Sequence, residues 1–216
     1  MNYIENKTSC KAASLDAEKA FDKLWRDGLF FKLINVIPID FWFILKIYYD
    51  SSMAVLLLDF DILSSLFIIN CGVKQGGILS PFLFNIFIND LIIECCDANL
   101  GALIGNLNVC IIVYADDILL ISSVDSHLQK LLDICSNYSQ VWRIKFNSSK
   151  SNIIEFGNQI FKNSKFYINN NPISKVDKIE YLGVAIDSKL DFDLSATENF
   201  IKVQKSVFSL SFLGLP

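Results

Sequence analysis

The stretch that decides the fold runs from Val109 to Ser122 and reads VCIIVYADDILLIS. Two apolar, β-branched runs flank the adjacent acids Asp116 and Asp117, and this pattern predicts a β-hairpin with both acids at its turn. Aspartate is common in turns, so the pair taken alone is equally consistent with a structural turn. Two neighbouring carboxylates resist ionisation, however, unless cations neutralise them. The stretch therefore predicts a candidate cation site at the end of a buried hairpin.

A third acid belongs to the same candidate site. Asp16 follows the apolar residues 12–15, which fit a short strand, and so it lies at the C-terminal end of that strand. Hard divalent ions such as Mg²⁺ prefer carboxylate oxygen, and two of them can stabilise the attacking and leaving oxygens of an in-line phosphoryl transfer. We therefore expect the carboxyl groups of Asp16, Asp116 and Asp117 to converge in one metal site.

The rest of the chain mixes helices, strands and hairpins without a regular βαβ alternation, which predicts an α+β fold. Residues 72–77 form a loop, in which the adjacent glycines Gly76 and Gly77 permit unusual backbone angles. We expect Ser80 to cap one helix, and Asp125 or Ser126 to cap another. Helices are expected at residues 18–37, 39–49, 79–96 and 125–142, and strands at 53–58, 66–71, 109–114, 118–122, 151–156, 166–168 and 179–186.

The composition predicts one intracellular domain with a single core. Apolar residues make up 52% of the chain, but the longest apolar stretches are too short or too interrupted to span a membrane. The N-terminus lacks the basic start and apolar run of a secretory signal. The six cysteines include no C-x-x-C pair and are expected to be reduced core residues. We expect a protein of the nucleus or cytoplasm that is neither secreted nor embedded in a membrane.

Five segments, taken in order, resemble a known family. Residues 14–22 (SLDAEKAFD), 72–84 (GVKQGGILSPFLF) and 114–117 (YADD) resemble successive palm motifs of the reverse transcriptases of non-LTR (LINE-type) retrotransposons. Residues 144–147 (IKFN) with Lys150 and Ser151 resemble the next motif, and residues 180–184 (EYLGV) the one after it. The resemblance implies a polymerase palm with an antiparallel sheet and packed helices. It covers residues 9–187.

The resemblance also implies roles for individual residues. Asp16 and Asp116 correspond to the principal metal ligands and Asp117 to the supporting acid, for two Mg²⁺ ions that Mn²⁺ can replace. Phe21, whose alternative reading is a core aromatic, corresponds to the residue that packs under the sugar and excludes a 2′-hydroxyl. The remaining matches are Gln75 and Gly76 for template and nucleotide contact, unless they form only a turn, Lys150 for the leaving pyrophosphate, Tyr114 for the primer end, and Tyr181, Leu182 and Gly183 for the primer grip.

The implied activity is RNA-directed DNA synthesis, with an RNA template, a DNA primer and dNTPs as partners. In domain terms, residues 1–187 are expected to form the palm with truncated fingers, and residues 188–216 the start of a truncated thumb-like region. The short segment before Asp16 and the net charge of −4 leave open a truncated, catalytically inactive retroelement remnant that acts as an interaction module. A metal phosphohydrolase is a further alternative, although it needs neither Gln75 and Gly76 nor the turn at residues 181–183.

Overall fold

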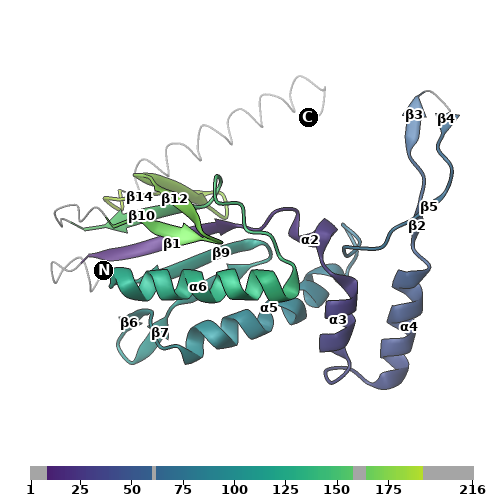
Figure 1. Ribbon diagram of the computed structural model, residues 1–216, viewed down its shortest axis with the longest axis horizontal. Coiled ribbons are helices and arrows are strands. Elements are labelled where there is room, and N and C mark those ends of the chain that lie inside the picture. The colour runs from purple at the N-terminus through teal and green to yellow at the C-terminus, as the bar shows by residue number, and fades with distance from the viewer. Residues whose placement is uncertain (1–8, 60–61, 158–163, 192–216) are drawn as a thin grey trace, which may run out of the picture.

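A six-stranded sheet forms the centre of the computed structural model, which describes residues 9–59, 62–157 and 164–191 (Figure 1). The strand order is β11-β12-β10-β1-β9-β8, and every neighbouring pair is antiparallel except β10 with β12. Together with its helices, the sheet confirms the α+β class. The strands are β1 (Cys10–Asp16), β8 (Ile111–Tyr114), β9 (Asp117–Ser122), β10 (Asn152–Phe156), β11 (Phe166–Ile168) and β12 (Asn171–Lys175).

Successive strand residues point to opposite faces of the sheet, and a buried core lies on each face. On one face, Ala13 and Leu15 of β1 pack in the main core with the helices α5 (Ser80–Asp97) and α6 (Asp125–Trp142). Figure 1 shows these two helices lying along the same side of the sheet. On the other face, a smaller core joins the sheet to the hairpin of β13 (Lys178–Tyr181) and β14 (Val184–Asp187). Its buried members are Ala12, Leu119, Ile154 and Ile179.

A helical extension with a long arm projects from one end of the sheet and the helices packed on it (Figure 1). The extension contains α3 (Arg26–Leu33) and α4 (Ile39–Asp50), and the arm follows α4. Two short antiparallel pairs form the arm, with β2 bonded to β5 and β3 to β4. These strands are β2 (Met53–Ala54), β3 (Leu57–Asp59), β4 (Ile62–Leu63) and β5 (Phe67–Ile68).

The buried guanidinium of Arg26 holds the extension together. It donates hydrogen bonds to the main-chain carbonyls of Gly72 and Tyr49, each at 2.8 Å, and to that of Ile69. It also lies over the ring of Tyr49, 5.1 Å from the centroid. Arg26 thus joins the end of α4, the base of the arm and the loop that begins at Gly72.

The single helix expected at residues 18–37 is wrong. The chain forms α2 (Ala20–Lys23), becomes extended at Leu24 (φ −52°, ψ 126°) and then starts α3. The carbonyls of Phe21 and Leu24 accept hydrogen bonds from the main-chain N–H groups of Val73 and Gly72, each at 2.8 Å. A continuous helix would need those carbonyls for its own ladder, so the contact with a distant loop interrupts it.

Both expected helix caps are also wrong. Ser80 is the first residue of α5 rather than its cap, and its hydroxyl donates to the carbonyl of Lys74. The N-cap of α6 is Val124, which makes no side-chain capping bond. The carboxylate of Asp125 instead forms an ion pair with the buried ammonium of Lys11 at 2.6 Å. The other three expected helices are confirmed to within two residues at each end.

Several strand predictions need correction. The strands expected at residues 53–58 and 66–71 are replaced by the four short strands of the arm, and the one expected at 179–186 is two strands of a hairpin. The sequence patterns also missed β12 and the hairpin of β6 (Ala102–Ile104) and β7 (Leu107–Val109). Each of these missed strands has five residues or fewer, too short for a clear alternation.

The cysteine prediction holds in part. All six cysteines are free thiols, but Cys71 and Cys96 are exposed rather than part of the core. In the described ranges, no helix has the length and apolar character needed to cross a membrane. The boundary expected at residue 187 lies close to the last described residue, and residues 192–216 lie outside the described part of the chain.

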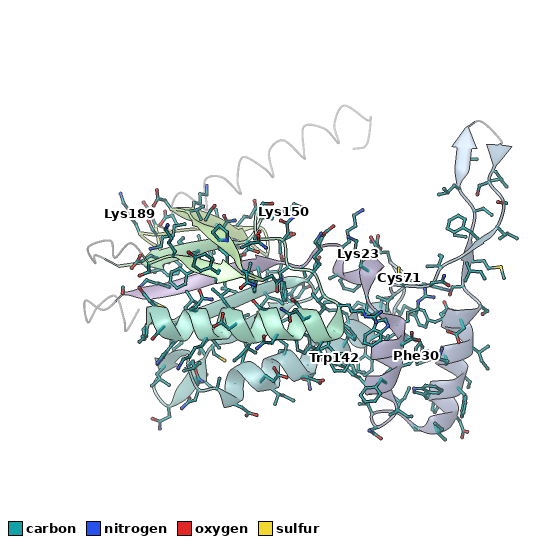
Figure 2. All side chains as sticks on the ribbon, viewed as in Figure 1. Lys23, Phe30, Cys71, Trp142, Lys150 and Lys189 are labelled. Atoms are coloured by element: carbon teal, nitrogen blue, oxygen red, sulfur yellow. The ribbon has the colours of Figure 1, made fainter. Side chains whose placement is uncertain are left out.

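Lys32 connects the extension to α5 and α6. Its ammonium donates to the Phe87 carbonyl and the Tyr138 hydroxyl, each at 2.6 Å, and pairs with Asp90 at 2.8 Å. The same ammonium lies 3.7 Å from the centroid of the Trp142 ring. Figure 2 shows Trp142 at the end of α6 that faces α3. Burial lowers the pKa of Lys32, and the charge of Asp90 opposes that shift.

We expect Lys32→Met to lower the free energy of unfolding by about 2 kcal/mol, since hydrogen bonds to a buried charged group are lost. Lys46→Met is the matched control, because the half-buried Lys46 forms an i,i+4 ion pair with Asp50 at 2.7 Å and lies over the Phe30 ring, 5.4 Å from its centroid, but makes no hydrogen bond into the core. That change should cost less than about 0.5 kcal/mol. Urea unfolding followed by circular dichroism measures both values, and equal losses in the two variants would contradict the role assigned to Lys32.

Candidate active site

The register of two strands places the acids at one edge of the sheet. In the pairing of β1 with β9, Asp16 lies directly opposite Asp117. The β8–β9 hairpin closes with Tyr114 opposite Asp117, which leaves Ala115 and Asp116 as its two-residue turn. Ala115 adopts the left-handed conformation (φ 53°) that this tight turn requires. Residues a hundred positions apart in the sequence therefore lie side by side.

The electrostatics of Asp117 reflect this crowding. Partial burial raises the pKa of Asp117, and the charges of Asp116 and Asp16 raise it further. Such a set of carboxylates attracts a cation, and oxygen donors suit a hard divalent ion. Among the residues that the structure describes, no group of three His, Cys, Asp or Glu side chains is already arranged around a common metal position. The donor chemistry therefore fits a divalent ion, whereas a closed ligand shell is not preformed.

A short segment after α6 holds the main chain of Asp16 in place. The N–H of Asn147 donates to the carbonyl of Asp16 at 2.9 Å, and the N–H of Asp16 donates to the hydroxyl of Ser151 at 3.3 Å. Ser151 is fully buried, and its hydroxyl donates in turn to the carbonyl of Asn147 at 2.8 Å. Both residues lie in a segment that resembles a family motif, but sequence reasoning gave them no positioning role. The pairing of a serine hydroxyl with a distant backbone leaves no periodic signal.

Phe21 lies on α2, shortly after Asp16, and is half-buried. Its ring stacks on Phe84 with the centroids 4.9 Å apart and the planes at 24°. Phe84 belongs to the core, with 1% of its surface exposed. One side of the Phe21 ring therefore packs against the core while the residue keeps some exposed surface, and this arrangement is compatible with both roles considered for it.

The loop that begins at Gly72 contacts the segment that follows β1. The side-chain amide of Gln75 donates to the carboxylate of Asp22 at 2.7 Å. Gly72 adopts φ +78°, and a Cβ there would lie 2.3 Å from the carbonyl oxygen of Asp22, so only glycine permits this approach. Gly76 adopts φ +75° and faces open space, since no atom lies within 4 Å of where its Cβ would be.

The remaining predicted site residues lie in different segments and differ in their exposure. Tyr114, next to the turn, is 65% exposed, and Lys150 is exposed in the loop before β10. The turn of the β13–β14 hairpin consists of Leu182 and Gly183, with φ angles of 52° and 76°. Burial raises the pKa of Tyr181, and the nearby charge of Asp117 raises it further. This hairpin therefore reaches the acids from the other face of the sheet.

Comparison with known proteins agrees with this architecture. The family model described as "Reverse transcriptase (RNA-dependent DNA polymerase)" matches residues 2–186. The chain therefore belongs to the reverse transcriptase family. Its relatives place it more closely: it is a reverse transcriptase domain of the non-LTR retrotransposon type.

Three curated relatives come from Drosophila retroelements. The RNA-directed DNA polymerase from mobile element jockey of Drosophila melanogaster is 26% identical over 222 residues, covering 100% of this chain and 24% of the relative. The jockey polymerase of Drosophila funebris is 28% identical and covers 89% of the chain and 21% of the relative. The probable polymerase from transposon X-element of Drosophila melanogaster is 26% identical and covers 92% and 22%. The chain thus spans about a quarter of the length of these relatives.

Solved telomerase structures share the fold. Apo telomerase from Candida tropicalis truncated from its C-terminal domain aligns with a TM-score of 0.63 at 18% identity, over 88% of this chain and 36% of that one. The apo telomerase of the same species aligns with a TM-score of 0.60 at 15% identity, over 88% of this chain and 33% of that one. At such identities the likeness supports the arrangement of strands and helices.

We expect Asp117→Asn to stabilise the chain at pH 7 in the absence of divalent ions. Folding raises the pKa of Asp117, so the folded state binds its proton more tightly than the unfolded state does. Stability from this group is therefore present at low pH and is lost as pH rises from the unfolded pKa through the folded pKa. The amide removes this loss and the repulsion from Asp16 opposite, a gain of about 0.5 kcal/mol after allowance for exposure.

Urea unfolding at pH 4 and pH 7 measures this effect. The gain should shrink at the lower pH, where a larger share of the parent carboxyl groups is protonated. Asp177→Asn, at an exposed carboxylate before β13, is the control and should change little at either pH. Equal stability of the Asp117→Asn variant and the parent at pH 7 would show that the acids do not strain the fold.

Proposed function

We propose that this chain carries the catalytic centre of RNA-directed DNA synthesis, adding a dNTP to the 3′-hydroxyl of a DNA primer on an RNA template. The observation that carries the proposal is the register that sets Asp16 against Asp117, with Asp116 in the adjoining turn. Membership of the reverse transcriptase family supports it. Such an enzyme works where RNA templates and dNTPs are present, in the nucleus or cytoplasm.

In this proposal, Asp16 and Asp116 hold two Mg²⁺ ions and Asp117 is the supporting acid. Such ions stabilise the attacking and leaving oxygens of phosphoryl transfer, and Mn²⁺ can take their place. Asn147 and Ser151 fix the backbone of Asp16 so that its carboxylate stays at the sheet edge. The protein's contribution is mainly to position charge, as is usual in phosphoryl transfer.

The surrounding residues bind and orient the substrates. Phe21 supports the sugar of the incoming nucleotide, and Gln75 and Gly76 contact the template and that nucleotide. The open space beside Gly76 supports this assignment, because a base or sugar can approach the backbone there. Lys150 approaches the leaving pyrophosphate and Tyr114 the primer end. The primer grip consists of Tyr181, Leu182 and Gly183.

We expect Asp116→Asn to lower primer extension at least about 1,000-fold, because losing a metal ligand removes several kcal/mol of transition-state stabilisation. The assay is extension of oligo(dT) on poly(rA) with dTTP and Mg²⁺. Binding of the same primer–template, followed by fluorescence anisotropy, should remain nearly unchanged, because the ligand serves the transition state more than the ground state. Asp97→Asn, at an exposed carboxylate ending α5, is the matched control and should keep full extension.

We expect Phe21→Val to raise the use of UTP relative to dTTP about tenfold or more on the same primer–template. A smaller side chain removes the clash with a 2′-hydroxyl, and about 1.4 kcal/mol of clash corresponds to a factor of ten. Phe31→Val is the control, since Phe31 is 72% exposed on α3, and it should leave sugar selectivity unchanged. Unaltered selectivity in an active Phe21→Val variant would assign Phe21 to the core alone.

A non-catalytic interaction module remains the second candidate, and one observation favours it. The extension and the arm expose many large apolar side chains, a feature of interaction surfaces. Folded parent chain that extends no primer with either Mg²⁺ or Mn²⁺ would support this candidate over the polymerase. The more exposed members are 62–70% exposed, and they are Phe41, Ile44, Ile47, Leu57, Leu63 and Leu66.

A further inference from the structure

Two cysteines far from the acids meet at the other end of the palm. Cys96 lies in the last turn of α5, and Cys110 lies between β7 and β8. Their sulfur atoms are 3.8 Å apart. Cys96 is exposed, whereas Cys110 is fully buried. The pair therefore combines a thiol that solvent can reach with a second thiol in contact behind it.

The main chain, rather than the thiols themselves, brings the two sulfurs together. Gly101 packs directly against Cys110, since a Cβ at Gly101 would lie 2.5 Å from the Cα of Cys110. The Ser122 hydroxyl donates to the carbonyl of Leu100 at 2.8 Å, and the Ile121 N–H donates to the carbonyl of Cys110 at 2.9 Å. These contacts bind the turn after α5 to the start of the catalytic hairpin, so the sulfurs stay adjacent without a covalent bond.

We propose that Cys96 and Cys110 form a reversible disulfide when a hydroperoxide oxidises the chain. This site is independent of the polymerase chemistry proposed above. A disulfide needs a sulfur–sulfur distance of about 2.05 Å, so the two side chains must close a gap of about 1.8 Å. Rotation of the exposed Cys96 side chain at the helix end can contribute this movement, because solvent rather than core packing surrounds it.

The reaction proceeds in two balanced steps. The Cys96 thiol loses its proton, and its sulfur attacks one oxygen of hydrogen peroxide; the O–O bond breaks and gives a sulfenic acid and one water. The Cys110 sulfur then attacks the Cys96 sulfur, the S–S bond forms, the S–O bond breaks, and the departing hydroxide takes the Cys110 proton as a second water. Two thiols supply the two electrons that reduce one peroxide. A dithiol such as dithiothreitol reverses the bond by exchange.

Cys96 reacts before Cys110 because Cys96 is exposed and Cys110 is buried. Burial raises the pKa of Cys110 to about 12, and contact with Cys96 adds to that shift. Cys110 is therefore the less reactive thiol at the start, and the first oxidation falls on the exposed Cys96. Cys95 and Cys135 also contact each other, but both are fully buried, so they form an internal comparison that peroxide cannot reach.

A disulfide here would join the end of α5 to the strand that leads to Asp116. The closed loop contains the β6–β7 hairpin and is about 15 residues long. Cross-links of that size stabilise the folded state mainly by restricting the unfolded chain. We therefore expect oxidation to raise the midpoint of thermal unfolding by about 5 °C or more, and reduction to return it.

The linkage can be read directly by mass spectrometry. The purified chain is oxidised with hydrogen peroxide, alkylated and cleaved before aspartate residues. This cleavage separates residues 90–96 from residues 97–115, whereas trypsin would leave both cysteines in one peptide because no Lys or Arg lies between residues 75 and 129. The expected product is the two peptides joined by a disulfide, which dithiothreitol separates.

Four variants make the result specific. Cys96→Ser and Cys110→Ser should each lose the linked peptides and the shift in unfolding midpoint. Cys95→Ser should keep both, which assigns the bond to Cys96 within the shared peptide. Cys71→Ser, at the other exposed thiol, should also keep both and serves as the control for exposure alone.

Two outcomes would overturn the proposal. In one, peroxide converts Cys96 to a sulfinic acid while Cys110 remains open to alkylation after unfolding. In the other, the bond forms between the neighbours Cys95 and Cys96 inside one peptide. An equal midpoint shift in the parent and in Cys96→Ser would show that the stabilisation does not come from this cross-link.

Discussion

The pairing of β1 with β9 is the constraint on which the rest of the structure depends. β1 lies between β9 and β10, so both of its edges are hydrogen-bonded within the sheet. Its two faces bury different partners: Ala13 and Leu15 join the core with α5 and α6, while Ala12 joins the core under the β13–β14 hairpin. A slip of one residue would exchange these faces, and for that reason the apolar side chains determine the register. The same register places Asp16 opposite Asp117, although the two charges repel each other.

Two buried cations extend this order from the palm to the arm. Arg26 satisfies three main-chain carbonyls, and its planar guanidinium keeps its charge even though burial lowers its pKa. Lys32 meets a carboxylate, a hydroxyl, a carbonyl and aromatic rings where α3 approaches α5 and α6. Because buried charges are costly without such partners, each cation holds its surrounding backbone in one arrangement. Arg26 in particular sets the start of the Gly72 loop, and through it the contact between Gln75 and Asp22.

The telomerase structure shares this fold at 18% identity, so the same arrangement of strands and helices forms from a largely different sequence. A backbone path can persist when the apolar alternation and the turn residues persist, even where individual side chains differ. Function depends instead on a few residues placed on that path. In this chain, the pairing of β1 with β9 and the β8–β9 hairpin bring Asp16, Asp116 and Asp117 to one edge of the sheet, although their segments lie far apart in the sequence.

The sequence by itself determined the β8–β9 hairpin, the helices near residues 39–49, 79–96 and 125–142, and the positions of Asp16, Asp116 and Asp117 at strand ends. These features depend on local alternation and periodicity, which neighbouring residues reveal. Only the tertiary structure decided the break between α2 and α3, the ion pair of Asp125 with Lys11, and the support of Asp16 by Ser151. In each case the partner lies tens of residues away or more. A backbone carbonyl or a side chain satisfied by a distant group leaves no periodic pattern in its own segment, so folding alone shows which partner it takes.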